Sequence, residues 1–441
     1  MGIGLLSRKH ILTMLRLHAT EATNKLKMLR LHATEATKMW AGCFGKPFSR
    51  NDHASGSAGL STIDYRLPTP LRPFALFAIS RLGALVLASL LVSQALAADW
   101  PMFRGGPDMT GRAASVLAAK PRLLWTYEAG GPVDSTAAIV GDTVYVGTSK
   151  KQVLALNMAN GKPKWKFTTN DSVIASPCVV GNAVYVGDEG GTLYAINRAD
   201  GKRLWKFQAN DKIASSATPA PGAILFGSYD HNLYCLNSAT GKLKWKFATE
   251  AQIHCSPCVA GGLAIIAGCD GEIRFIDIAT GKQKDAASLE GNLAAAPAYC
   301  AGVVYVGTLN GEYLAVRSKD ASIAWEIKDK NADGGIYSTA AVTPDAVVFS
   351  SRARTVFRVD PSTGKTRWVF RTKGECDSSP VISGGTVFVG CDAGELYGID
   401  LATGRRVWLF KTGSEIKASP AISNGRMVIG SGDGAIYCFG R

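Results

Sequence analysis

The sequence lacks several features that would decide its class at once. No C-x-x-C-H motif occurs among its 10 cysteines, which excludes covalently attached haem. No twin-arginine pair precedes its apolar segment, and position 98 holds alanine instead of the cysteine of a bacterial lipoprotein. The apolar run at residues 82–92 has 11 residues, whereas a membrane-spanning helix needs about 20. We therefore expect no transmembrane span in the mature chain.

Acidic residues are scarce near the N-terminus. The chain carries 49 Lys and Arg against 35 Asp and Glu, a formal charge of +14. Residues 1–97 contribute +8 of this surplus and residues 98–441 contribute +6. More than half of the basic excess thus lies in a segment that we expect to be absent from the mature protein. The remainder gives no case for a nucleic-acid partner.

The first 97 residues are typical of leader segments. The block MLRLHATEAT occurs at residues 14–23 and again at 28–37. We interpret residues 1–70 as a non-native or disordered leader; the alternative is a pair of basic amphipathic helices that touch a membrane. In residues 71–97, Arg72 and Arg81 accompany the apolar run, and Ala-Leu-Ala at 95–97 supplies a cleavage site. This order predicts a signal peptide and a periplasmic or secreted protein, with an uncleaved anchor as the alternative.

Tryptophans define an internal repeat. Seven of the nine tryptophans fall in one frame with a spacing of about 40 residues, and the slot between the fourth and fifth holds Asp285. Units such as SPCVVGNAVYVGDEGGTLYAINRADGKRLWKF contain four short strands separated by Gly-rich turns. A period of 40–45 residues with this strand content predicts a propeller. The seven tryptophans, each placed between neighbouring blades, are Trp125, Trp165, Trp205, Trp245, Trp325, Trp368 and Trp408.

The number of units predicts an all-β, eight-bladed β-propeller over residues 122–441, preceded by an N-terminal extension at 98–121. The eighth unit stops after three strands, and an orphan strand around Trp125 precedes the first unit. This N-terminal strand can complete the last blade and close the ring, which removes the exposed sheet edges. The fourth unit lacks its tryptophan and the fifth has Ala321 in place of the loop glycine, so we expect these two blades to be the least regular.

The phrases DIATGKQKD, DPSTGKTRW and DLATGRRVW resemble the PQQ-like (quinoprotein) propeller repeat. The resemblance covers roughly residues 99–441 and implies the fold of both BamB-like outer-membrane assembly proteins and PQQ-dependent alcohol dehydrogenases. In those dehydrogenases PQQ stacks on a tryptophan under a disulfide of adjacent cysteines and contacts Ca²⁺. No two cysteines are adjacent in this chain. We therefore expect no cofactor and no catalytic residues, with PQQ and Ca²⁺ as the alternative.

We interpret the chain as a non-enzymatic, BamB-like binding or scaffold protein, monomeric, with a protein or peptide partner in the cell envelope. A PQQ-dependent dehydrogenase and a polysaccharide-binding propeller are the alternatives. Strand direction places the residues before each Ser-Pro on the same face as the turns between second and third strands. The candidate binding rim on that face, which we expect to hold no metal, comprises Asp230, His231, His254, Asp270, Arg352, Arg354 and Asp392. The two arginines could grip a carboxylate or phosphate.

The mature chain has nine cysteines, an odd number, so at least one thiol is unpaired. Cys376 and Cys391 fall at adjoining ends of antiparallel first and second strands, and Cys255 and Cys269 have nearly the same relation. Antiparallel neighbours approach closely enough for a disulfide. We predict the pairs 376–391 and 255–269; the alternative is that these are small buried residues that stay reduced.

Overall fold

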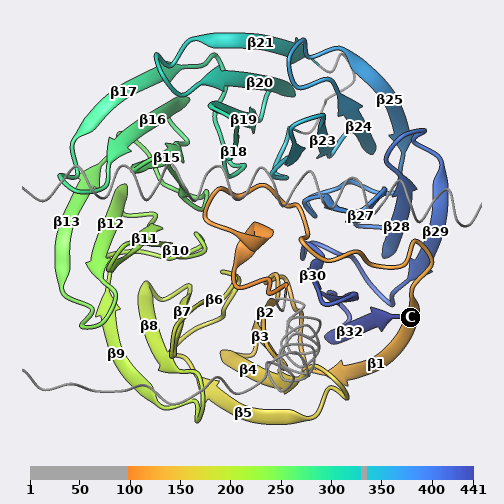
Figure 1. Ribbon diagram of the computed structural model, residues 1–441. Coiled ribbons are helices and arrows are strands. Elements are labelled where there is room, and N and C mark those ends of the chain that lie inside the picture. Colours follow the sequence, from red (N-terminus) through yellow and green to blue (C-terminus); the bar gives the residue numbers. More distant parts are fainter. Residues whose placement is uncertain (1–97, 329–334) are drawn as a thin grey trace, which may run out of the picture. The chain divides into compact units, whose positions relative to one another are not determined.

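Short runs of apolar residues separated by turn-forming glycines produce a ring of antiparallel sheets. The computed structural model describes residues 98–328 and 335–441, which belong to one compact unit, Ser80–Arg441 (Figure 1). The predicted eight-bladed all-β propeller is confirmed: eight four-stranded sheets follow one another around the ring. The leader, the duplicated block and the signal peptide predicted for residues 1–97 lie outside the described residues.

Blades 1 to 4 repeat the same antiparallel order from the inner to the outer strand. Blade 1 contains β2 (Ala138–Val140), β3 (Thr143–Thr148), β4 (Gln152–Asn157) and β5 (Pro163–Thr168). Blade 2 contains β6 (Cys178–Val180), β7 (Ala183–Gly187), β8 (Thr192–Asn197) and β9 (Arg203–Gln208). Blade 3 contains β10 (Thr218–Ala220), β11 (Ala223–Gly227), β12 (Asn232–Asn237) and β13 (Leu243–Ala248). Blade 4 contains β14 (Cys258–Ala260), β15 (Leu263–Ala267), β16 (Glu272–Asp277) and β17 (Gln283–Ser288).

Blades 5 to 8 continue this order, and the last blade closes the ring. Blade 5 contains β18 (Ala298–Cys300), β19 (Val303–Gly307), β20 (Glu312–Arg317) and β21 (Ile323–Lys328). Blade 6 contains β22 (Ala341–Thr343), β23 (Ala346–Ser351), β24 (Thr355–Val359) and β25 (Thr366–Arg371). Blade 7 contains β26 (Val381–Ser383), β27 (Thr386–Gly390), β28 (Glu395–Asp400) and β29 (Arg406–Lys411). Blade 8 contains β30 (Ala421–Ser423), β31 (Arg426–Gly430), β32 (Ala435–Gly440) and the N-terminal β1 (Arg122–Glu128).

Ring closure by the strand around Trp125 is confirmed. β1 pairs antiparallel with β32, and Trp125 lies opposite Cys438 in the register. The two ends of the propeller sequence are therefore joined by main-chain hydrogen bonds, and β32 has no free edge.

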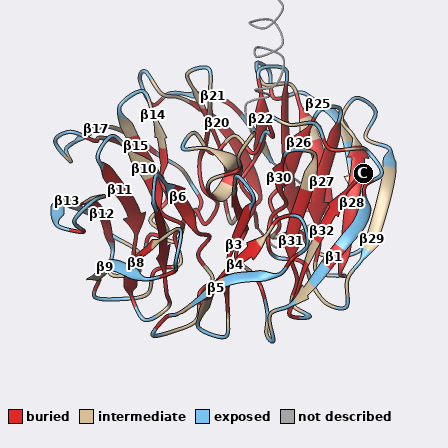
Figure 2. Ribbon diagram, turned by 60° about the horizontal axis from the view of Figure 1, so that its bottom comes forward, coloured by how far each residue is buried: buried red, intermediate tan, exposed pale blue. Residues whose placement is uncertain are grey.

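The inner strands hold the core, and the outer strands face solvent (Figure 2). Every residue of β7 is buried, whereas β9 of the same blade alternates between exposed and half-buried positions. Each outer strand also carries a β-bulge one residue before the repeat position of tryptophan, as between Pro163 and Trp165. The bulge exposes two successive side chains at this point of the strand.

Six of the seven repeat tryptophans clamp their blade to the next blade around the ring. They are Trp125, Trp165, Trp205, Trp245, Trp325 and Trp368. The indole Nε1–H of Trp205 donates to the carbonyl of Ser238 at 3.1 Å, and the ring lies against Gly241. A Cβ at Gly241, whose φ is +69°, would lie 2.6 Å from this ring, so the position requires glycine. The T-G dipeptide of the repeat is thus half of a clamp between blades.

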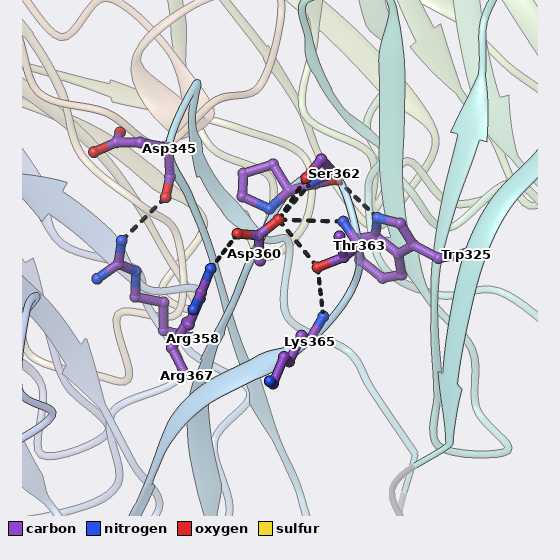
Figure 3. A network of polar contacts seen from close by, with 9 residues as sticks. Trp325, Asp345, Arg358, Asp360, Ser362, Thr363, Lys365 and Arg367 are labelled. Atoms are coloured by element: carbon purple, nitrogen blue, oxygen red, sulfur yellow. Dashed lines mark hydrogen bonds and ion pairs between the residues drawn. The ribbon is translucent and has the colours of Figure 1, made fainter.

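The aspartate of the repeat organises the same loop, as Figure 3 shows for blade 6. One carboxylate oxygen of Asp360 accepts hydrogen bonds from the backbone N–H and hydroxyl groups of Ser362 and Thr363. The other oxygen accepts from Arg367 at 2.6 Å, and Trp325 of blade 5 donates to the carbonyl of Pro361. The Ser362 hydroxyl, followed by Arg367, holds the pKa of Asp360 below its usual range.

The serine of each Ser-Pro phrase links neighbouring blades around the channel. The backbone N–H of Ser176 donates to Ser216 Oγ at 2.9 Å, and the N–H of Ser216 donates to Ser256 Oγ at 2.9 Å. The same link between Ser419 and Thr136, at 3.0 Å, crosses the closure point of the ring. Ala296 has no hydroxyl and cannot accept the equivalent bond from blade 4.

Residues 98–121 form a strap across one end of the channel, seen in orange at the centre of Figure 1. Its main chain bonds to the middle residue of the inner strand in six blades, for example Val259 N–H to the Pro107 carbonyl at 2.7 Å. A 3₁₀ turn, η1 (Phe103–Gly105), interrupts these contacts. Arg104 in this turn is fully buried and donates to the carbonyls of Ala340 and Pro380.

Candidate functional site: the channel cup and its loop face

The inner strands surround a cup of about 140 Å³ whose lining includes Phe103 of the strap. Two rings of side chains line it, with one residue from each blade in each ring. The inner ring consists of the Ser-Pro residues and their equivalents: Thr136, Ser176, Ser216, Ser256, Ala296, Thr339, Ser379 and Ser419. The mouth ring lies two residues earlier in each blade: Asp134, Ile174, Ala214, His254, Ala294, Tyr337, Asp377 and Lys417.

The mouth ring is chemically lopsided. Blades 7, 8 and 1 contribute Asp377, Lys417 and Asp134 in succession, whereas blades 2, 3 and 5 contribute only aliphatic side chains. Burial raises the pKa of Asp134, and Lys417 opposes this shift. One side of the cup can therefore bind charged or hydrogen-bonding groups, and the other side offers an apolar wall.

Arg352 lies beside this charged side but is engaged within the protein. Its guanidinium binds both carboxylate oxygens of Asp377, at 2.7 and 2.8 Å, and lies 3.6 Å from the centroid of the Tyr337 ring. Asp377 raises the pKa of Arg352 above its usual range. The carboxylate that Arg352 binds is thus that of the protein's own Asp377. Through its contacts with Asp377 and Tyr337, Arg352 holds two mouth-ring residues in place.

His254 is the predicted rim residue that lies in the mouth ring itself. Its Nδ1 is 2.7 Å from the hydroxyl of Tyr229, and the two rings lie 5.9 Å apart. Burial, followed by the charge of Lys212, lowers the pKa of His254. A neutral imidazole at this place offers the cup one donor or acceptor without a charge.

Two of the predicted rim aspartates hold their own turns. Asp230 accepts from the backbone of Asn232 and from the Tyr234 hydroxyl at 2.7 Å. Asp270 pairs with Arg274 at 2.8 Å and accepts from the Glu272 backbone. Both carboxylates are engaged in turn formation.

The three remaining rim residues lie at hairpin turns on the loop face, which is the face that carries the turns between the second and third strands of each blade. His231 and Arg354 have left-handed backbone, with φ of 66° and 58°. Asp392 is half-buried, its Oδ1 has no hydrogen-bond partner among the described residues, and burial raises its pKa. Among the seven rim residues, the structure therefore brings His254 to the cup, with Arg352 attached to the mouth ring through Asp377.

The nine cysteines of the described chain are free thiols. The thiol of Cys255 donates to the Ala267 carbonyl and accepts from the Ala267 N–H, as Ser135 Oγ does with Gly147. The thiol of Cys376 lies 3.4 Å from Thr372 Oγ1. Burial raises the pKa of Cys255 to about 12. The disulfide pairs 376–391 and 255–269 stay predictions.

Sequence reasoning did not single out Asp134, Tyr337 and Lys417 as site residues, nor Phe103 of the strap. The signal for the first three is positional, because each lies two residues before the Ser or Thr that opens its blade. No comparable signal marks Phe103, which reaches the cup through the path of the strap. Among residues 98–328 and 335–441, no group of three or more His, Cys, Asp and Glu is arranged to hold a metal ion. No helix in those ranges is long and apolar enough to cross a membrane.

The sequence matches the family described as outer membrane protein assembly factor BamB in four overlapping segments, residues 110–226, 216–334, 286–374 and 352–440. The chain belongs to this family. Its fold is similar to that of BamB from Moraxella catarrhalis, with a TM-score of 0.65 and 16% identity over 73% of this chain and 100% of that one.

Quinoprotein dehydrogenases have the same fold as this BamB-family chain. A quinohemoprotein alcohol dehydrogenase from Comamonas testosteroni is similar with a TM-score of 0.67 and 15% identity, over 78% of this chain and 80% of that one. A europium-containing methanol dehydrogenase is similar with a TM-score of 0.67 and 13% identity, over 78% and 98%. No curated protein sequence gave a significant match. At such identities the solved structures share the fold with this chain, and its function has to be argued from its own residues.

Proposed function

We propose that the protein is an exported, non-enzymatic propeller that binds a protein or peptide partner on its loop face. The observation that carries the proposal is the contrast between the two faces. On the strap face, which is the face crossed by residues 98–121, the Asn/Asp-x-x-Asn/Asp/Thr-Gly loops recur in most blades. A side-chain carboxylate or amide oxygen organises each of these loops. On the loop face, the residue at the same place in the hairpin differs in every blade: Ser149, Glu189, Tyr229, Cys269, Leu309, Arg352, Asp392 and Gly432.

Variation at this hairpin position offers selectivity, because each blade presents a different group there to a bound chain. The cup at its centre has an apolar wall beside Asp377, Lys417 and Asp134. Its volume of about 140 Å³ suits the tip of one side chain of a partner docked on the rim. The BamB family to which the chain belongs is described as an outer membrane protein assembly factor, which supports a protein partner.

The residues of the cup do not fit PQQ with Ca²⁺. Pockets for ligands of drug size measure about 300–1,000 Å³, well above the volume of the cup. The lining contains no tryptophan on which a quinone could stack, and the inner ring consists of Ser, Thr and Ala.

Site-specific photo-crosslinking in cells tests the proposal. A photoreactive residue in place of Lys417 in the mouth ring should capture a defined envelope protein. The same residue in place of Lys319, an exposed lysine on the strap face, is the matched control and should not capture it. A Lys417→Glu variant should lose the partner in a pull-down, while Lys319→Glu retains it.

Two results would contradict the proposal. One is equal capture from both positions, which would remove the loop face as the docking surface. The other is oxidation of alcohols or sugars by the purified protein that depends on added PQQ and Ca²⁺. Recovery of polysaccharide alone would favour the polysaccharide-binding alternative.

A further inference from the structure

The outer strands β9 and β13, neighbours on the circumference in Figure 1, carry a dense group of exposed cations. Arg203 and Lys206 lie on β9, and Lys244 and Lys246 lie on β13. All four side chains are exposed, and none forms an ion pair with any residue that the structure describes. The clamp between blades uses the indole rings of Trp205 and Trp245, and the charges of these four side chains have no part in it.

Two leucines are exposed among these cations. Leu204 is 50% exposed and Leu243 is 48% exposed. In β9 and β13 the bulge exposes both residues before the tryptophan, so that Leu204 stands beside Arg203, and Leu243 beside Lys244. The basic face, defined as Arg203, Leu204, Lys206, Leu243, Lys244 and Lys246, thus combines aliphatic and cationic groups on two adjacent strands.

We propose that the basic face binds the surface of an anionic lipid bilayer. Lysine and arginine near such a surface are attracted to its negative potential, and exposed leucines gain by entering the boundary between headgroups and acyl chains. The long aliphatic stems of the lysines can lie along the same boundary while their ammonium groups reach the headgroups. Both kinds of side chain on β9 and β13 therefore contribute to the same contact.

A soluble polyanion fits this face less well. It would use the cations alone and leave Leu204 and Leu243 in water. Single-stranded nucleic acid is bound through exposed aromatic faces, and the aromatic rings of these strands point the other way. Trp205 and Trp245 donate their indole N–H groups to carbonyls of the next blade, at 3.1 and 2.8 Å, and lie half-buried between blades.

Blade 5 supplies a matched control within the chain. At the positions of Leu243, Lys244 and Lys246, β21 carries Ile323, Ala324 and Glu326. Ile323 is 45% exposed, close to the value for Leu243. At these positions β21 thus has the aliphatic group without the cations, and its Lys328 is paired with Glu312, so we expect β21 to have no part in lipid binding.

Vesicle co-sedimentation of the purified protein tests the proposal. The protein should bind vesicles of phosphatidylglycerol with phosphatidylcholine, should bind phosphatidylcholine vesicles weakly, and should be released by high salt. Replacing both Lys206 and Lys246 by glutamine should weaken binding roughly 30-fold, at about 1 kcal/mol for each lysine. Leu204→Ala with Leu243→Ala should weaken binding as well, whereas Ile323→Ala should not change it.

Thermal unfolding of each variant shows whether the propeller is intact, and all five sites are exposed. The proposal is overturned if the folded wild-type protein does not distinguish anionic from neutral vesicles. It is also overturned if dextran sulfate or DNA binds as tightly as the vesicles and the leucine substitutions have no effect. Partner capture at Lys417 should be the same in all of these variants, which separates this proposal from the docking function of the loop face.

Discussion

Asp285 in β17 and Ala321 in the following blade stand at the two sides of one blade interface, at positions that elsewhere hold a tryptophan and the glycine it contacts. The register supports this equivalence, because Asp285 lies opposite Phe275 as Trp245 lies opposite Cys235. Ala321 has a left-handed φ of 53°, the conformation of the loop glycines in other blades. Because Asp285 places no indole ring against this loop, the Cβ of Ala321 fits there. The absence of the tryptophan and the absence of the glycine therefore depend on each other.

This relationship predicts a coupled pair of substitutions. Asp285→Trp alone should destabilise the protein or leave it unchanged, because the new ring meets the Ala321 Cβ. Combined with Ala321→Gly it should stabilise, since the clamp between blades 4 and 5 is then complete. We expect a coupling free energy of about 0.5–3 kcal/mol in a double-mutant cycle of thermal unfolding. Additive effects would show that the two positions do not share an interface.

The converse change provides the control for this cycle. Gly241→Ala would place a Cβ 2.6 Å from the Trp205 ring at a φ of +69°. We expect a loss of about 1–3 kcal/mol in the free energy of unfolding, from overpacking and backbone strain together. A variant as stable as the wild type would remove the clamp as an explanation of the T-G phrase.

The fold could be predicted from the sequence because the features that fix it are periodic. The tryptophan frame, the turn glycines and the missing fourth strand of the last unit specified eight blades and closure by the Trp125 strand. The site was predicted only in part. Asp230 and Asp270 looked like rim residues, but their carboxylates are engaged by neighbouring turn groups. A sequence pattern shows which residues share a face and does not show which of them already have partners.

His254 predicts a pH dependence of stability. Burial lowers the pKa of His254 in the folded protein below its value of 6.5 in the unfolded chain. Its contribution to stability is therefore present above pH 6.5 and is lost as the pH falls from 6.5 through the folded pKa, because the unfolded state binds the proton more readily. The melting temperature should fall on acidification in this window, and His254→Gln should reduce the fall.

Cys255 is expected either to remain a reduced thiol that takes the place of a serine or to form a disulfide with Cys269. The Cys255 thiol occupies the place of a serine hydroxyl and bonds to both polar groups of the Ala267 backbone, so Cys255→Ser should preserve stability. Oxidation, however, would join it to Cys269 if the predicted pairing holds. A tryptic map without reductant, on protein recovered from the cell envelope, should show the 376–391 link first and the 255–269 link second. Free alkylation of all four thiols in that protein would contradict the pairing.

The path of the strap explains why the cup has a floor. Strap carbonyls accept from the middle residue of the inner strand in blades 2 and 4, where Val179 and Val259 donate at 2.8 and 2.7 Å. In blade 3, between them, the equivalent residue is Pro219, which has no N–H to donate. At this point along the strap the main chain forms η1, whose Phe103 helps to line the cup.

This arrangement predicts the outcome of moving the proline. Val259→Pro should lower the free energy of unfolding by about 0.5–1.5 kcal/mol, the net value of one hydrogen bond, because the Pro107 carbonyl loses its donor. The backbone should accept the ring there, since Pro219 occupies the same position in blade 3 and the ladder bonds of β14 use its neighbours Cys258 and Ala260. Pro219→Val is the matched control, and we expect no gain from it because η1 interrupts the extended strap at blade 3. Denaturant unfolding measures both variants, and a Val259→Pro protein that fails to fold, or a stabilised Pro219→Val protein, would show that the strap is held in another way.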